Sequence, residues 1–211
     1  MQKVIFLVII IMTATIIYSQ TPCPDTTTVT YSGKTYNTVK IGSQCWLKEN
    51  LDVGTMIEGS QNQTDKGTIK KHCYNNISNN CSKYGGLYQW NEAMQYVTTE
   101  KSQGICPNGW HIPTKKEFQM LNTTINNNCN ILKEIGQGKG TNITGFAALL
   151  SGYLNVENIF IDLGYSTTLW SSTEGYVGIA CGMGLFYYGS DDGLVYTSKE
   201  YSYSVRCLKD N

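Results

Sequence analysis

The feature that most constrains this chain is a set of eight cysteines behind an apolar leader. Lys3 is followed by an apolar stretch over residues 4–17, and then by Tyr18 and the small residue Ser19. The stretch is shorter than the ~20 residues that a membrane-spanning helix needs, so residues 1–19 are predicted to be a signal peptide. Retention of this segment as an anchor is the alternative. Because export carries a chain into an oxidising compartment, we expect the cysteines to form disulfides.

Zinc binding is the competing use of these cysteines. Zinc sites combine close Cys-x2-Cys pairs with nearby histidines. Here the shortest cysteine spacing runs from Cys73 to Cys81, and His72 and His111 are the only histidines. We therefore expect disulfides and no metal site. Eight cysteines allow about a hundred pairings, and their spacing alone does not choose among them. Lipidation of Cys23 is not expected, because a proline precedes it where a small residue is needed.

The composition excludes electrostatic attraction as a lead to function. The 16 basic and 16 acidic residues balance, so no net charge draws the chain to nucleic acid or to an anionic membrane. Hydrophobic residues make up 41% of the chain, which is enough for a core, and the length fits one domain after processing. We expect an amino-terminal arm over residues 20–28 and a single domain over residues 29–211.

Two segments have the pattern of helices. Thr114 and Glu117 have the spacing of a capping box, so a helix is predicted to begin after Thr114. Helical spacing of apolar residues over residues 87–97 predicts an earlier amphipathic helix. The positions that would face the core are Leu87, Trp90, Met94 and Val97 in the earlier helix, and Phe118, Leu121 and Ile125 in the later one.

Short β-type runs surround these helices. Residues 29–46 have the pattern of an antiparallel meander, and further runs fill the last third of the chain. Asp192-Gly193 predicts a hairpin turn, and residues 201–207 alternate like a terminal strand with one apolar face. The polar residues 59–80 are predicted to form a long surface loop. This order predicts an α+β domain in which two short helices pack on antiparallel β-sheet, with long loops.

Five segments of the chain together match one known pattern. They read YGGLYQWNEAM (84–94), GICPNGWHIPTKKEF (104–118), GFAALLSGY (145–153), LWSSTE (169–174) and YSVRCLKD (203–210). In this order they resemble the Fibrobacter succinogenes major paralogous domain family, over about Val29 to Asp210. The resemblance implies a secreted or cell-surface bacterial protein with a C-type lectin-like fold, distantly similar to formylglycine-generating enzymes. It implies no established molecular activity.

The resemblance also bears on the pairing of the cysteines. Members of the family tend to have cysteines at the CPNGW and SVRC positions, which implies a disulfide between Cys106 and Cys207. The other expected pairs are Cys73–Cys81 by local closure, Cys23–Cys45 by attachment of the arm, and Cys129–Cys181 by elimination only. On the chain-entropy model each closure stabilises the fold by about 2–4 kcal/mol.

An enzymatic site has little support in the sequence. Formylglycine-generating enzymes, as the resemblance has it, use two copper-binding cysteines just before the terminal R-C motif, and the stretch VYTSKEYSYS here contains none. Glycoside cleavage needs two carboxylates. The candidates are Glu117, Glu174, Asp191 and Asp192, but nothing places two of them together. Capping explains Glu117 and the turn explains the aspartates, and His111 is expected to be structural.

Binding of a glycan or a protein surface without calcium is the favoured function. Calcium-dependent lectins of this fold resemble one another in an E-P-N or Q-P-D loop and a W-N-D strand, and the chain has neither. Exposed aromatic side chains can stack on a ligand while amides form hydrogen bonds. Trp170 suits the core equally well, and Tyr187 and Tyr188 are expected on opposite faces of a strand. The candidate contacts are Trp170, Tyr176, Tyr187 and Tyr188.

Arg206 is the only arginine of the chain, and it lies in the last predicted strand next to Cys207. A single arginine in this position suggests either a specific partner or an internal ion pair. We favour an ion pair with Glu117 or Glu174, which would lock the helix to the sheet.

The sequence thus predicts a secreted, disulfide-stabilised, non-enzymatic recognition or surface-display module that needs no cofactor. Its partner would be a glycan or a protein surface, and it would have no membrane span once the signal peptide is removed. A glycan-active enzyme on the same scaffold and a purely structural envelope protein are the alternatives. Because Asn211 alone follows the SVRCLKD motif, no anchoring tail is expected, and release from the cell or periplasmic residence follows.

Overall fold

The computed structural model describes residues 20–65, 67–189 and 193–210. The predicted signal peptide over residues 1–19 lies outside the described residues, as do Asp191 and Asp192 of the predicted hairpin turn. Over the described ranges, every helix is too short or too polar to span a bilayer.

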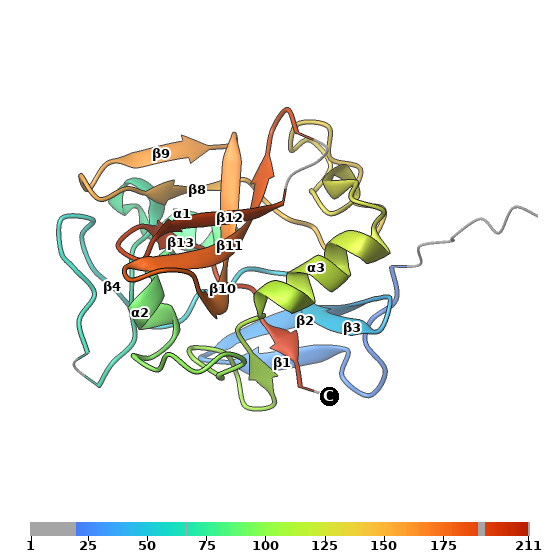
Figure 1. Cartoon of the computed structure of the whole chain (residues 1–211), viewed down its shortest axis with the longest axis horizontal. Coiled ribbons are helices and arrows are strands. Elements are labelled where there is room, and N and C mark those ends of the chain that lie inside the picture. Colours follow the sequence, from blue (N-terminus) through green and yellow to red (C-terminus); the bar gives the residue numbers. More distant parts are fainter. Residues whose placement is uncertain (1–19, 66, 190–192, 211) are drawn as a thin grey trace, which may run out of the picture.

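Both ends of the domain meet in one five-stranded sheet, drawn in blue and red at the bottom of Figure 1. The first three strands form the predicted antiparallel meander. Gly33 and Gly42 adopt positive φ angles in its two turns, 78° and 60°, and Ser32 in the first turn adopts 48°. The carboxyl-terminal strand pairs with β3 on one side and with β7 on the other. In spatial order the strands are β1 (Thr28–Tyr31), β2 (Lys34–Ile41), β3 (Gln44–Leu47), β14 (Leu208–Lys209) and β7 (Trp110–His111).

Three further sheets build the other half of the domain. The longest strands pair in an antiparallel, three-stranded sheet, in which β11 and β12 form the two arms of the predicted hairpin. That sheet consists of β10 (Ser166–Glu174), β11 (Ile179–Phe186) and β12 (Leu194–Ser198). The four-stranded sheet consists of β6 (Tyr88–Gln89), β13 (Ser202–Tyr203), β8 (Ser151–Leu154) and β9 (Phe160–Leu163). A parallel pair consists of β4 (Thr55–Met56) and β5 (Lys70–Lys71).

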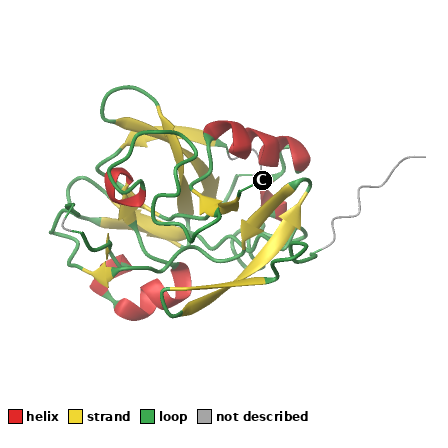
Figure 2. Cartoon of the chain, turned by 90° about the horizontal axis from the view of Figure 1, so that it is seen from below, coloured by secondary structure: helices red, strands yellow, loops and turns green. Residues whose placement is uncertain are grey.

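The helices are short, and long loops connect them to the strands (Figure 2). They are α1 (Ser78–Tyr84), α2 (Trp90–Ala93), α3 (Lys115–Thr124) and the 3-10 turns η1 (Tyr74–Asn76) and η2 (Cys129–Ile131). The α+β class predicted from the sequence is therefore confirmed. Helix α3 begins after Thr114 as predicted, because the side chains of Thr114 and Glu117 form both hydrogen bonds of the capping box.

Two predictions of local structure need correction. The helix expected over residues 87–97 is reduced to α2, because Tyr88 and Gln89 pair with β13 and because Gln95 and Tyr96 have positive φ angles. The surface loop expected over residues 59–80 contains β5, η1 and the start of α1. A disulfide buries Cys73 inside this segment and supplies the core contact that its polar composition does not show.

Helix α3 packs between the amino-terminal meander and the three-stranded sheet. On one side, Phe118 stacks on Trp46 of β3 with ring centroids 5.6 Å apart. On the other side, the helix packs against β10, β11 and β12. Figure 1 shows α3 lying across the molecule between these strands and the amino-terminal meander. The apolar stripe of Phe118, Leu121 and Ile125 is fully buried, as its spacing predicts.

Three of the four expected disulfides form: Cys23–Cys45, Cys73–Cys81 and Cys106–Cys207. The expected Cys129–Cys181 bond is wrong, because both residues are buried thiols. Cys129 lies beside Asn122, near the end of α3, whereas Cys181 lies beside Lys115 at its start. These two positions are about 10 Å apart along the helix axis. A disulfide needs Cα atoms within about 7 Å, so elimination by sequence chose the wrong partners.

The last segment of the chain is buried on both faces, which corrects the expected polar outer face. Tyr203, Val205 and Cys207 are buried as predicted, but Ser204 and Arg206 are also at most 1% exposed. The hydroxyl of Ser204 lies 2.9 Å from that of Ser151. Successive residues of this segment therefore face two buried environments in turn, rather than the core and the solvent.

We expect the Cys106–Cys207 disulfide to stabilise the domain more than Cys73–Cys81. The first closes a separation of 101 residues and the second a separation of 8. On the chain-entropy model their removal costs about 4.7 and about 2.5 kcal/mol of unfolding free energy, respectively. Denaturant unfolding of the two paired Cys→Ala variants measures this difference. An equal loss in both variants would contradict the prediction.

Candidate functional site

The described residues enclose a cleft of about 440 Å³, here called the amide cleft. It lies where β6, β8 and the turn between β12 and β13 meet the loop before β5. Figure 1 shows β8 and β13, two of these elements, on its left-hand side. Neutral polar side chains dominate its lining. The lining residues are Asn62, Gln63, Thr64, His72, Gln89, Asn91, Leu154, Asn155, Val156, Asn158, Lys199 and Glu200.

Two glutamines attach the loop of the cleft to β6. The backbone N–H of Gln63 donates to Oε1 of Gln89 at 3.0 Å, and the backbone N–H of Gln89 donates to Oε1 of Gln63 at 2.8 Å. Each side-chain oxygen thus accepts the hydrogen bond from the other residue's backbone N–H, as a neighbouring strand would do in a sheet. The Gln63 amide also donates to the carbonyl of Leu87 at 3.0 Å. This reciprocal pair keeps one wall of the cleft in place without an aliphatic core beneath the loop.

His72 is a structural support beneath the cleft. Its side chain is buried, and burial lowers its pKa, so the neutral imidazole is favoured. Nε2 lies 2.8 Å from the carbonyl oxygen of Gln61 and must donate to it. Nδ1 is then an acceptor, and it lies 3.0 Å from the Ser202 hydroxyl and 3.2 Å from the Gln63 amide. Both ring nitrogens of His72 therefore bond to groups of the protein itself.

Several polar groups of the cleft face solvent with hydrogen-bonding capacity left. The side-chain amides of Asn91 and Asn158 make no hydrogen bond within the described ranges, and both residues are exposed. Lys199 is already engaged, because its ammonium pairs with Glu174 and lies 4.0 Å from the ring centroid of Trp90. Glu200 is the one carboxylate in the lining. The cleft therefore presents amides, with little charge.

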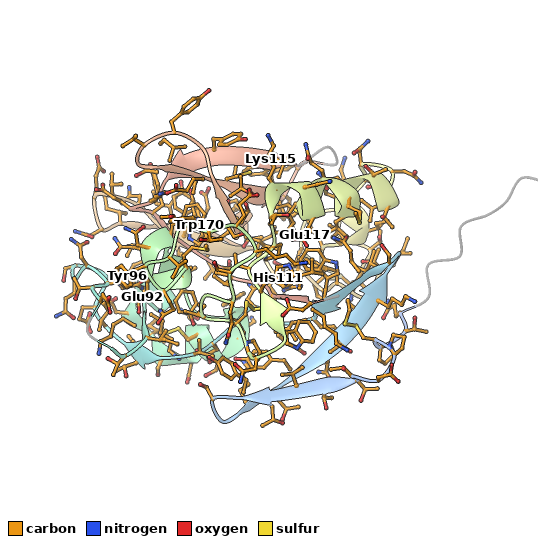
Figure 3. The ribbon with its side chains drawn as sticks, turned by 60° about the horizontal axis from the view of Figure 1, so that its bottom comes forward. Glu92, Tyr96, His111, Lys115, Glu117 and Trp170 are labelled. Atoms are coloured by element: carbon orange, nitrogen blue, oxygen red, sulfur yellow. A yellow bond between two sulfur atoms is a disulfide. The ribbon has the colours of Figure 1, made fainter. Side chains whose placement is uncertain are left out.

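A second polar cluster joins β7, α3 and the carboxyl-terminal end. Nδ1 of the buried His111 lies 2.5 Å from Oδ1 of Asp210, and Nε2 lies 3.1 Å from Oε2 of Glu117. Burial would raise the pKa of Glu117, but hydrogen bonds from His111 and Thr114 outweigh it and hold the pKa below its ordinary value. Figure 3 shows His111 and Glu117 side by side at the start of α3. The cluster connects three elements of the fold.

Glu92 is a buried carboxylate with a similar structural task. Its two oxygens accept hydrogen bonds from the backbone N–H of Lys70 and from the hydroxyl of Tyr96, each at 2.7 Å. These bonds tie α2 to β5 and to the loop that follows α2. Figure 3 places Glu92 and Tyr96 well apart from His111 and Glu117, so the two clusters are separate.

The ion pair expected for Arg206 does not form. Glu117 binds His111, and Glu174 binds Lys199. Arg206 donates instead to Oδ1 of Asn50, from Nε at 3.1 Å and from Nη2 at 2.7 Å, and from Nη1 to the carbonyl of Phe146. Its guanidinium carbon also lies 4.3 Å from the centroid of the Phe146 ring.

Within the described ranges no carboxylate forms a salt bridge with Arg206, although the residue is 1% exposed. Burial lowers its pKa to about 9. The predicted pair does not form because Glu117 and Glu174 are engaged by His111 and Lys199, whereas the guanidinium of Arg206 reaches the amide of Asn50 and the carbonyl of Phe146.

The aromatic candidates do not form one site. Trp170 is fully buried, and its Nε1 donates to the carbonyl of Tyr88 at 2.7 Å, so its assignment as a ligand contact is wrong. Tyr176 is 84% exposed, but it lies at the opposite end of β11 from Tyr187 and Tyr188. An eight-residue strand separates these ends by about 26 Å.

The tyrosines after β11 also differ from expectation. The strand ends at Phe186, so Tyr187 and Tyr188 do not alternate across it, and their ring centroids are 4.7 Å apart. Tyr187 also contacts Tyr165, at 5.6 Å. This small aromatic patch is exposed at Tyr188 and remains a candidate contact surface.

Sequence reasoning missed the residues of the amide cleft. The one signal was the excess of Asn and Gln over residues 59–80, which predicted only a loop. The partners that turn this loop into a wall, such as Gln89 and Asn155, are far away in the chain. Over the described part of the chain, no three His, Cys, Asp or Glu residues are grouped closely enough to hold a metal ion.

We expect Glu117 to make the fold sensitive to acid. Because its pKa is held below the ordinary 4.5, its contribution to stability is present above that pH and is lost as the pH falls through the lowered pKa. Glu117→Gln should therefore flatten the decrease in Tm between about pH 6 and about pH 3. The exposed Glu157→Gln is the matched control. If both variants follow the wild-type curve, the assignment is wrong.

The sequence-family model of the Fibrobacter succinogenes major domain matches residues 39–209 of this chain. No curated protein and no solved structure matches the chain significantly. The match covers most of the described domain, including α3, the three disulfide-bonded cysteines after position 80 and the whole amide cleft. The chain therefore belongs to the Fibrobacter succinogenes major domain family.

Proposed function

We propose that this protein is a secreted, non-enzymatic recognition module that binds a glycan in the amide cleft without calcium. The observation that carries the proposal is the chemistry of the lining. Asn and Gln side chains each present a donor and an acceptor without charge, which matches the hydroxyl groups of a neutral sugar. Asn62, Gln63, Gln89, Asn91, Asn155 and Asn158 bring six such side chains to one cleft. Gln63, Gln89 and Asn155 form hydrogen bonds that hold the walls, whereas the side-chain amides of Asn91 and Asn158 make none within the described ranges and are open to a ligand.

The size and preorganisation of the cleft support the same ligand class. Its volume of about 440 Å³ lies within the range of about 300–1,000 Å³ that is usual for small-ligand pockets. The Gln63–Gln89 pair holds one wall in place before a ligand arrives, which reduces the ordering cost of binding. Leu154 and Val156 supply apolar surface for the C–H faces of a sugar ring.

A binding role fits the titratable groups better than glycoside hydrolysis does. Hydrolysis of this type uses two carboxylates, and the lining contributes Glu200 alone. His72 uses both ring nitrogens in bonds within the protein. Lys199 is paired with Glu174. We therefore propose that a sugar is held in the cleft rather than cleaved.

We also propose a C-type lectin-like architecture and a place outside the cytoplasm. The pairing of the carboxyl-terminal strand with β3, which joins both ends of the domain in one sheet, supports the first proposal. Three disulfides and the leader-like residues 1–19 support the second, because disulfides persist in oxidising compartments. A module released to the cell surface would meet glycans there.

We expect the disulfide-bonded protein to bind selected neutral glycans from a broad array, equally with calcium and with a chelator. Replacing both Asn91 and Asn62 by Ala should weaken binding about 5–30-fold, since each lost hydrogen bond costs about 1 kcal/mol. Both residues are exposed, so the Tm should not change. Isothermal titration with the best glycan measures the loss.

Gln119→Ala is the matched control, because it removes an exposed amide from α3, outside the cleft. An unchanged affinity in the Asn91/Asn62 variant would exclude the cleft as the site. Loss of binding in the chelator would exclude a calcium-free mode. Release of shortened sugars during the assay would show that the protein is an enzyme.

A further inference from the structure

A second cavity, of about 380 Å³, lies apart from the amide cleft and shares no lining residue with it. It is enclosed by the start of β2, the segment after β3, the end of α1 and the chain around position 147. We call it the arginine pocket. Its lining residues are Lys34, Thr35, Lys48, Glu49, Asn50, Ser82, Lys83, Tyr84, Gly85, Glu134, Ala147, Leu149 and Arg206.

The arginine pocket has a buried cation at its floor. Arg206 lines the cavity but is only 1% exposed, and Asn50 beside it is 4% exposed. A guanidinium carries five N–H donors, and three hydrogen bonds account for its contacts with Asn50 and Phe146. Two of its N–H donors thus make no hydrogen bond within the described ranges. Keeping a cation in such a place is costly unless an anion reaches it.

The wall of the pocket adds positive charge. Lys34, Lys48 and Lys83 join Arg206, against the two carboxylates of Glu49 and Glu134. Both carboxylates already accept hydrogen bonds within the protein. Glu49 accepts from the backbone N–H and the side-chain amide of Asn37, and Glu134 accepts from the side-chain amide of Asn142. Lys34 also pairs with Asp52 at 3.7 Å, which leaves Lys48, Lys83 and Arg206 against the two carboxylates. This excess of one positive charge favours a ligand with a single negative charge.

From this arrangement we infer that the arginine pocket binds the carboxylate of an acidic sugar, such as a uronic acid. A planar guanidinium matches a carboxylate in shape and donors. The two glutamates would repel a doubly charged phosphate, but they can accept hydrogen bonds from sugar hydroxyls. A cavity of this volume also admits a sugar ring. The inference does not rest on the amide cleft.

The single arginine makes the inference directly measurable. Because Arg206 is the only arginine, its Nε–H gives the one arginine signal in a ¹⁵N-correlated NMR spectrum of the disulfide-bonded protein. We expect this signal and the side-chain amide of Asn50 to shift saturably on addition of sodium glucuronate. Glucose should leave both in place. Equal shifts with glucose, or no shift with glucuronate, would overturn the inference.

Variants of the wall test the role of charge without disturbing the buried arginine. The exposed Lys83→Gln should weaken glucuronate binding about three- to tenfold, as expected for loss of one nearby charge. Lys116→Gln on α3 removes the same charge outside the pocket and should have no effect. Equal effects of the two variants would mean that the contact is non-specific and would contradict the inference.

Two further measurements distinguish an acidic-sugar site in the arginine pocket from a peptide site and from the amide cleft. A dipeptide with a free carboxyl end tests a peptide ligand, and tighter binding of the dipeptide than of glucuronate would overturn the sugar assignment. Asn91→Ala in the amide cleft should leave glucuronate binding unchanged. Unchanged glucuronate binding in that variant shows that the two proposals can be tested separately, so that a negative result for the glycan cleft does not count against the arginine pocket.

Discussion

The structure depends on complete burial of the chain segment from Ser202 to Leu208. This segment passes between the two halves of the domain and is bonded to both. Its disulfide reaches Cys106, its backbone pairs with β3, β6, β7 and β8, and its arginine holds Asn50 and the loop at Phe146. The chain is rich in loops, and its helices are short. These few connections therefore hold the two halves of the domain together. The arginine pocket forms where loops meet this central segment at Arg206.

The sequence predicts those parts of the fold that local physics determines. The capping box at Thr114 and the turns at Gly33 and Gly42 each depend on residues within a few positions of one another, and all of them are present. The Cys106–Cys207 pair is not local, and it came from resemblance to the family. The α2 helix is shorter than its pattern indicates, because pairing with β13, more than a hundred positions away, competes with local helical spacing.

The candidate site was largely outside the reach of such reasoning. Trp170 is of a residue type that often contacts ligands, but in the fold its side chain is fully buried in the core. Arg206 was expected to find a carboxylate, and it finds an amide that is 156 positions earlier in the chain. Amide side chains such as Gln63 and Gln89 carry no motif, and only the folded loop shows that they face each other. Sites built from neutral side chains leave little trace in one sequence.

The proposal that the amide cleft is a glycan site can be tested most directly by mapping where a bound oligosaccharide lies. Saturation-transfer and chemical-shift NMR, with the glycan that binds most tightly in a calcium-free array, would locate the contact. Our account predicts that the side-chain amides of Asn62, Gln63, Gln89 and Asn91 shift on binding. Shifts confined to the tyrosine patch at Tyr165, Tyr187 and Tyr188, with the cleft unaffected, would contradict it.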